Sequence, residues 1–311
     1  MTAKSLTSRR RELSAFLAEI KYALYLIRRN TLVVAGSAMG LFFIVLSAGA
    51  TFIVNPELAH DIEYSSSYCW SNSYISWGPN IAKCAVNDYH LLGTDGFGRD
   101  LLSMIILAIP LDIVIAFEIV IAATAIGVVI GAIAAYAGGK IDELILRITD
   151  VFFAFPGLVL ALVFAAIFGR NLETLTIAVL LVWWPTYVRL IRGQILSEKE
   201  KSYVEALKAL GAGRVRILFR HIVPNAIYPV LVNSTLDIGG VILTFSALMF
   251  LGFSPSPAVP ELGNLAADGI RHVFDAPWLI VFPGLTILLI ALAFNLGGDG
   301  LRDVLDPRLR R

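Results

Sequence analysis

The sequence predicts an all-α integral membrane protein with six transmembrane helices and with both termini in the cytoplasm. Of its 311 residues, 57% are hydrophobic and 16% are charged, whereas soluble domains carry about 45–50% apolar and about 25% charged residues. Several apolar runs are long enough to cross the roughly 30 Å hydrocarbon core of a bilayer as helices. The net charge of +1 gives no electrostatic basis for binding nucleic acid.

The distribution of basic residues predicts the orientation. With six spans and a cytoplasmic N-terminus, only Lys83, Arg99, Arg170 and Arg271 of the 25 Lys and Arg residues fall outside. Short inner loops of membrane proteins carry an excess of Lys and Arg. The chain therefore fits this topology.

Residues 1–30 form the first segment, and they combine basic side chains with apolar ones at helical spacing. We expect a cytoplasmic amphipathic helix that lies on membrane lipid. The alternative is a disordered basic tail. The first transmembrane helix is expected at 31–54.

Residues 55–110 are the longest polar segment and are expected to be extracytoplasmic. Cys69 and Cys84 lie in it, where a disulfide is a candidate and two unpaired thiols are the alternative. Two cysteines are too few for a disulfide scaffold, and no Cys/His cluster has the spacing of metal ligands.

Residues 111–297 carry five further apolar runs. The four-residue interval between Gly127 and Gly131 favours close helix contact. A bend is expected at Phe155-Pro156-Gly157. The spans are expected at 111–136, 148–168, 174–192, 226–252 and 278–296, with a short inner loop at 137–147 and a cytoplasmic tail at 298–311.

Four acidic side chains fall in these spans, and Asp150 is expected at the inner end of the span at 148–168. Asp112 is expected near the interface, while Glu118 and Asp237 lie deeper, where a carboxylate is unfavourable unless it faces protein or water. Both are candidates for a polar contact in a pore or between subunits. The alternatives are a side chain that reaches outward at Glu118 and a hydrogen bond to a neighbouring helix at Asp237.

A charged stretch, about 193–225, separates the fourth and fifth spans and contains a short helix. Ser202 and Glu205 have the spacing of a capping box, and Gly211 is suited to end the helix in the left-handed conformation. Val204, Leu207 and Leu210 recur at helical spacing and predict one apolar edge. A basic segment with Arg214, Arg216 and Arg220 follows, and Pro224 is expected to end it.

The sequence contains no candidate catalytic residues and no motif for a cofactor. Gly138-Gly139-Lys140 lacks the earlier glycine of a P-loop, and Ile141 stands where Ser or Thr is needed. The four histidines are scattered and suggest no active site. We therefore expect no ATP binding by this chain through that motif.

Several motifs nevertheless resemble one family. Glu205-Ala206, Gly211 and Val223-Pro224 resemble the EAA loop in membrane subunits of ATP-driven importers. HLLGTDGFGRD at 90–100 and AFNLGGDGLRDVLDPRLRR at 293–311 are similar to segments of the dipeptide/oligopeptide class. Leu207, where the family often has alanine, and Glu261, where tryptophan is common, depart from the pattern.

The chain is thus identified as resembling the second, C-type permease subunit of an ABC importer, which implies a type I ABC importer permease fold. The resemblance implies that the short helix docks on an ATPase subunit. The residues that it assigns to this contact are Ser202, Tyr203, Glu205, Ala206, Leu207, Leu210, Gly211, Arg214 and Arg216.

The resemblance also implies the partners: a homologous second permease subunit, two ATP-binding subunits that hydrolyse ATP, and an extracytoplasmic solute-binding protein. The implied location is the cell membrane of a prokaryote. Oligopeptides or dipeptides are the expected substrates, and oligosaccharides are the alternative. An ion-coupled secondary transporter is a further alternative, but it calls for inverted repeats and ionisable clusters at the midplane, and we find neither.

Overall fold

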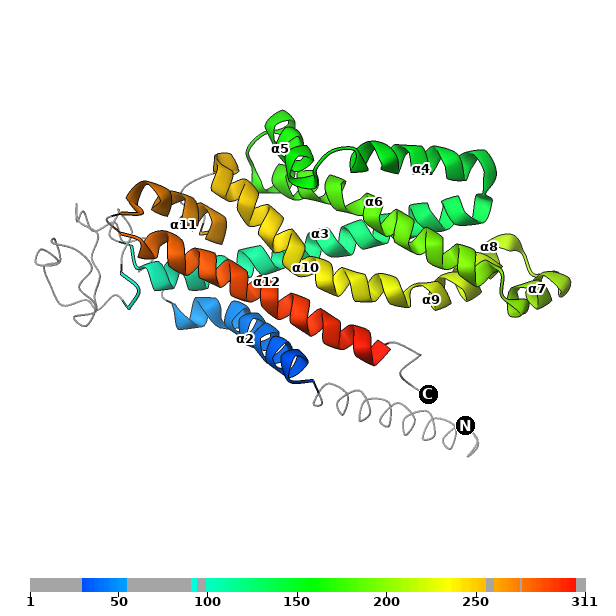
Figure 1. Cartoon of the computed structure of the whole chain (residues 1–311), viewed down its shortest axis with the longest axis horizontal. Coiled ribbons are helices and arrows are strands. Elements are labelled where there is room, and N and C mark those ends of the chain that lie inside the picture. Colours follow the sequence, from blue (N-terminus) through cyan, green and yellow to red (C-terminus); the bar gives the residue numbers. More distant parts are fainter. Residues whose placement is uncertain (1–29, 55–90, 94–98, 256–259, 275, 306–311) are drawn as a thin grey trace, which may run out of the picture.

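The structure is a computed structural model that describes residues 30–54, 91–93, 99–255, 260–274 and 276–305. Every element in these ranges is a helix, and the helices lie side by side in an elongated bundle with α7 at one end and α11 at the other (Figure 1). The elements are α2 (Thr31–Ile53), α3 (Leu101–Ala137), α4 (Gly139–Phe153), α5 (Gly157–Phe168), α6 (Leu172–Lys199), α7 (Ser202–Ala209), α8 (Arg214–Ile217), the π-helix η3 (Leu218–Ile222), α9 (Val223–Ala226), α10 (Tyr228–Leu248), the π-helix η4 (Met249–Phe253), α11 (Leu262–Gly269), the 3-10 helix η5 (Ile270–His272) and α12 (Trp278–Leu305).

Five of these helices are long and apolar enough to cross a membrane, and the number is six if α4 and α5 together form one span. These two helices meet at an angle of 90°. The break between them contains Phe155 and Pro156, and Gly157 begins α5. The predicted bend at this tripeptide is confirmed.

The second span begins earlier than we expected. Its helix, α3, starts at Leu101 instead of Leu111, and Pro110 lies inside it. Asp100 caps this helix, because its carboxylate accepts a hydrogen bond of 2.7 Å from the N–H of Ser103. The proline removes one backbone hydrogen bond but does not end the helix.

The expected inner loop at 137–147 is also corrected. Gly138 and Gly139 have φ values of +66° and +57°, which glycine adopts at little steric cost. The chain therefore reverses within these two residues, and α4 begins at Gly139.

The helices of three other spans also differ from what we expected. The helices that we expected to end at Arg192 and Leu296 continue to Lys199 and Leu305. The span expected at 226–252 is α10 followed by the π-helix η4.

The contact between α3 and α6 depends on small residues. A Cβ at Gly127 would lie 3.0 Å from the carbonyl oxygen of Trp184, and a Cβ at Gly131 would lie 2.5 Å from that of Val188. Only glycine fits this approach, so the predicted close helix contact is confirmed.

The buried side chains form two hydrophobic clusters. The first cluster is largest on α3, α10, α11 and α12 and also takes in residues of α2, α5, α6 and η4. The second cluster lies where α3 and α6 meet α7 and the segment of α8, η3 and α9, with Val230 of α10 beside it. The second cluster therefore anchors the short helices that follow α6. The N-terminal segment 1–29, Cys69 and Cys84 lie outside the described residues.

Candidate functional site

The short helix α7 starts without the expected cap. Lys201 is its N-cap residue, and no side chain accepts a hydrogen bond from its first turn. Because the N–H of Val204 donates to the Lys201 carbonyl at 3.0 Å, Ser202 already lies inside the helix, where it cannot act as the capping residue. The predicted capping box of Ser202 and Glu205 is therefore wrong.

The start of α7 is instead held by a buried acid at the end of α6. Glu198 is 8% exposed, forms an ion pair with Lys201 and accepts a 3.3 Å hydrogen bond from the hydroxyl of Tyr203. Burial raises the pKa of the Tyr203 phenol, so this hydroxyl remains a donor at neutral pH.

The end of α7 is as the sequence predicts. Gly211 has a φ of +76°. Its N–H donates to the carbonyl of Lys208 at 3.0 Å, and the N–H of Ala212 donates to that of Leu207 at 3.1 Å. These two bonds are a Schellman motif, which fixes the direction of the chain as it leaves the helix.

The helix has one buried side and one exposed side. Val204 is fully buried and packs with the half-buried Tyr203 and Leu207 in the second hydrophobic cluster. Leu210, which we expected on the same edge, is 83% exposed because it is the C-cap residue, beyond the last full turn. The other exposed candidates are Ser202, Glu205, Ala206 and Gly211.

The segment after α7 continues this exposed surface. Arg214 and Arg216 are exposed on α8, with Val215 between them at 71% exposure. Ile217 is buried and anchors the segment to the second cluster. Pro224 does not end the segment as expected, because α9 includes it in its first turn, where a proline needs no N–H partner.

Two polar contacts connect the end of α6 to other spans. The guanidinium of Arg192 binds Asp142 of α4 through two hydrogen bonds of 2.6 Å each, a bidentate geometry that favours one orientation. The ammonium of Lys199 donates to the carbonyl of Ala135 in α3 at 3.0 Å. The last turns of α6, which lead into α7, are therefore bound to both α3 and α4.

The two candidate acids within the spans have different surroundings. Asp237 of α10 accepts hydrogen bonds of 2.8 Å from the hydroxyl of Tyr187 in α6 and from the amide of Asn233. Glu118 is exposed on α3, with the exposed Val114 and Ile121 one turn to either side. The structure thus shows the hydrogen bond to a neighbouring helix that we considered for Asp237.

Asp112 is another acid of the spans. It is 2% exposed, and its carboxylate accepts a hydrogen bond from the N–H of Leu262 in α11. Its position near the membrane interface stays a prediction. Glu261 lies beside Asp112. In the sequence, it is notable only because the family that the chain resembles commonly has tryptophan at this position. No pattern pairs these residues, because 149 positions separate them.

No group of three or more His, Cys, Asp and Glu side chains is placed to hold a metal ion in the part of the chain that the structure describes. The exposed helix α7 is bound to the end of α6, and α6 is bound in turn to α3 and α4.

The fold is that of a type I permease, a multi-pass membrane protein built from apolar helices. Residues 127–311 match the model of the family described as binding-protein-dependent transport system inner membrane component, and the chain belongs to this family.

Three relatives are similar over most of their length. The dipeptide transport system permease protein DppC of Alkalihalophilus pseudofirmus is 40% identical over 77% of this chain and 79% of the relative. DppC of Haemophilus influenzae is 42% identical over 72% of this chain and 76% of the relative. The glutathione transport system permease protein GsiD of Pectobacterium atrosepticum is 37% identical over 88% of this chain and 87% of the relative.

Proposed function

We propose that this chain is the C-type permease subunit of a peptide-importing ABC transporter and that α7 is its contact with an ATP-binding subunit. The observation that carries the proposal is the two-sided burial of α7. Val204 is fully buried in its own chain, while Leu210 at the C-cap and Val215 on α8 are 83% and 71% exposed. Exposed apolar side chains that gather in one patch mark a surface that another protein covers, and we infer that these two side chains belong to such a patch.

The mechanism follows from the connections of this helix. Movement of the ATP-binding subunit displaces α7 as a unit, because the Tyr203–Glu198 contact fixes its start and the Schellman motif at Gly211 fixes its end. The displacement passes along α6 to Asp142 of α4 and Ala135 of α3. The spans then move between inward-open and outward-open arrangements.

The complex needs further subunits, because one chain forms half of a pathway. We propose a homologous second permease, two ATP-binding subunits in which ATP is hydrolysed, and an extracytoplasmic solute-binding protein, in the cell membrane of a prokaryote. Glu118 supports the second permease, since an exposed carboxylate on an apolar helix face must meet protein or water within the membrane.

We propose dipeptides or oligopeptides as the substrate. The names of the relatives refer to dipeptide and glutathione transport, which favours peptides over the oligosaccharide alternative. The family also favours ATP-dependent transport over ion-coupled transport. The test is the uptake of a labelled dipeptide in the presence of unlabelled competitors. We expect unlabelled dipeptides to reduce this uptake and oligosaccharides to leave it unchanged.

Substitutions in and beside α7 test the coupling. Gly211→Val places a β-branched residue at a φ of +76°, and Glu205→Arg reverses a charge on the exposed side of the helix. We expect both variants to insert in the membrane but to lose ATP-driven uptake. Gly213→Ala is the matched control, because its φ is −64° and no atom lies within 4 Å of the added Cβ.

A contact measurement complements the transport assay. With Leu210→Cys in the assembled complex, we expect cross-linking to an ATP-binding subunit, because this side chain is exposed at the end of α7. Normal uptake by both coupling variants, together with no cross-link at Leu210→Cys, would contradict the proposal.

A further inference from the structure

At the end of the bundle opposite α7, the helix α11 is held in place by two buried carboxyl groups (Figure 1). Glu261 is fully buried and caps α11, because one of its carboxyl oxygens accepts a 2.7 Å hydrogen bond from the N–H of Asn264. Asp112 of α3 is 2% exposed, and its Oδ2 accepts a 3.3 Å bond from the N–H of Leu262. Both carboxyls therefore bind the first turn of the same helix.

Each of these carboxyls has a second oxygen without a donor. Asp112 Oδ1 and Glu261 Oε1 are buried and have no hydrogen-bond partner, and neither has the hydroxyl oxygen of Ser246 in α10. Glu261 is the main charged group that acts on Asp112, and Ser246 lies beside Glu261. The Ser246 hydroxyl carries one proton and can donate to only one oxygen of Glu261, so neither carboxyl receives a donor from the other while both are ionised.

Ionised carboxylates only accept hydrogen bonds. Two of them cannot satisfy each other, and two like charges in a buried site repel. The groups that act most strongly on the pair are backbone N–H donors of α11 and the neutral Ser246, with no basic side chain of α3, α10, α11 or α12 among them. A proton on one of the carboxyls would supply a donor between them.

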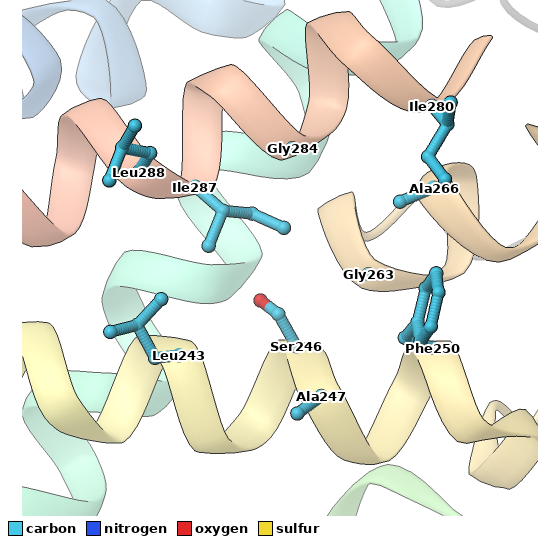
Figure 2. Close-up of a pocket in the computed structure, with 10 residues that line it drawn as sticks. All are labelled: Leu243, Ser246, Ala247, Phe250, Gly263, Ala266, Ile280, Gly284, Ile287 and Leu288. Carbon is cyan, nitrogen blue, oxygen red and sulfur yellow. The ribbon is translucent and has the colours of Figure 1, made fainter. Parts of the chain in front are cut away.

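The backbone around the pair leaves little room to move the charges apart. A Cβ at Gly263 would lie 2.7 Å from the carbonyl carbon of Ser246, and a Cβ at Gly269 would lie 2.6 Å from the backbone nitrogen of Ile280. The helix α11 is thus pressed against both α10 and α12. A neighbouring cavity of about 290 Å³ is lined by apolar residues and by Ser246, whose hydroxyl points into it in Figure 2.

We propose that Asp112 and Glu261 form a buried proton-binding site that fastens α11 to α3. With the proton bound, one carboxyl donates to the other across the two helices. When the proton leaves, two negative charges face each other in an apolar environment, and their repulsion weakens the packing of α11 against α3. Burial raises the pKa of Glu261 to about 7, so this carboxyl keeps its proton at a pH where exposed carboxyls are ionised. This inference goes beyond the proposed function and does not depend on the substrate.

Infrared difference spectroscopy of the full chain in phosphatidylcholine nanodiscs detects the proton directly. Between about pH 6 and about pH 9, where exposed carboxyls are already ionised, we expect the carbonyl stretch of a protonated carboxyl to disappear as pH rises. Glu261→Gln and Asp112→Asn should each remove this band. Glu173→Gln, at an exposed acid in the first turn of α6, should retain it.

Thermal unfolding of the same samples provides the second readout. The wild-type melting temperature should fall by several degrees over this pH range, whereas that of Glu261→Gln should stay level, because an amide donates to Asp112 at every pH. The wild-type spectrum tests the site even if a variant does not fold. The assignment would be overturned if the wild-type chain showed no band of a protonated carboxyl at about pH 6, or if both variants kept this band. Stabilisation by Na⁺ or Ca²⁺ that is lost in Glu261→Gln would also overturn it, because the site would then bind a metal ion.

Discussion

The contact between α3 and α6 gives a prediction whose magnitude follows from the structure. In Gly131→Ala, the new Cβ would lie 2.5 Å from the carbonyl oxygen of Val188, about 0.8 Å closer than the ~3.3 Å of a close carbon–oxygen contact. The neighbour is backbone, so the two helices must separate by a similar amount. Such overpacking costs about 1–3 kcal/mol, while alanine gains up to about 1 kcal/mol over glycine in a helix.

Gly193→Ala in α6 is the matched control, because its added Cβ has no atom within 4 Å. Both variants gain the same helix propensity, so the difference between them isolates the steric effect of about 1–3 kcal/mol. We expect Gly131→Ala to melt several degrees below Gly193→Ala when unfolding is followed in nanodiscs. Equal melting temperatures would refute the argument that only glycine fits at residue 131.

Three further predictions concern polar contacts. Tyr187→Phe removes a 2.8 Å hydrogen bond to Asp237 and should lower the free energy of unfolding by about 1–3 kcal/mol; an unchanged melting temperature would show that this bond is replaceable. Arg192→Lys should lose about 1 kcal/mol of coupling to Asp142 in a double-mutant cycle with Asp142→Ala, because lysine cannot form the bidentate contact; an undiminished coupling energy would argue against the bidentate geometry. The pKa of Glu261 is raised from 4.5 to about 7 in the folded state. Between about pH 4.5 and about pH 7, the folded state therefore binds more protons than the unfolded state. The contribution of Glu261 to the free energy of unfolding is fully present below about pH 4.5, is lost as the pH rises through about 7, and is absent at higher pH. Calorimetry at several pH values checks the last prediction, and a contribution that instead grows with pH would reverse its sign.

Short-range patterns determine the path of the chain from the sequence alone. The apolar run that begins at Thr31 is a helix, the chain bends at Phe155-Pro156-Gly157, and Gly211 in the left-handed conformation terminates α7. These features depend on hydropathy or on backbone freedom within a few residues, which are properties of the local sequence. The same holds for the motifs that indicate the family.

Helix starts and exposed edges are less well determined. Proline at 110 reads as a boundary, yet α3 passes through it because Asp100 caps the helix earlier. Ser202 and Glu205 have the spacing of a cap, but Lys201 takes that position one residue before. A shift of one residue also places Leu210 at the C-cap, where it is exposed. Local patterns fix such boundaries only to within a few residues.

The tertiary structure alone decides which polar groups meet. Tyr187 binds Asp237 across 50 positions, and Asp112 binds the N–H of Leu262 across 150. No local pattern indicates either contact, since each depends on how α3, α6, α10 and α11 pack. Whether a carboxyl in an apolar run meets lipid, a partner helix or a second carboxyl depends on that packing. The sequence therefore determines where the helices and their bends lie, and the packing of distant helices determines the chemistry between them.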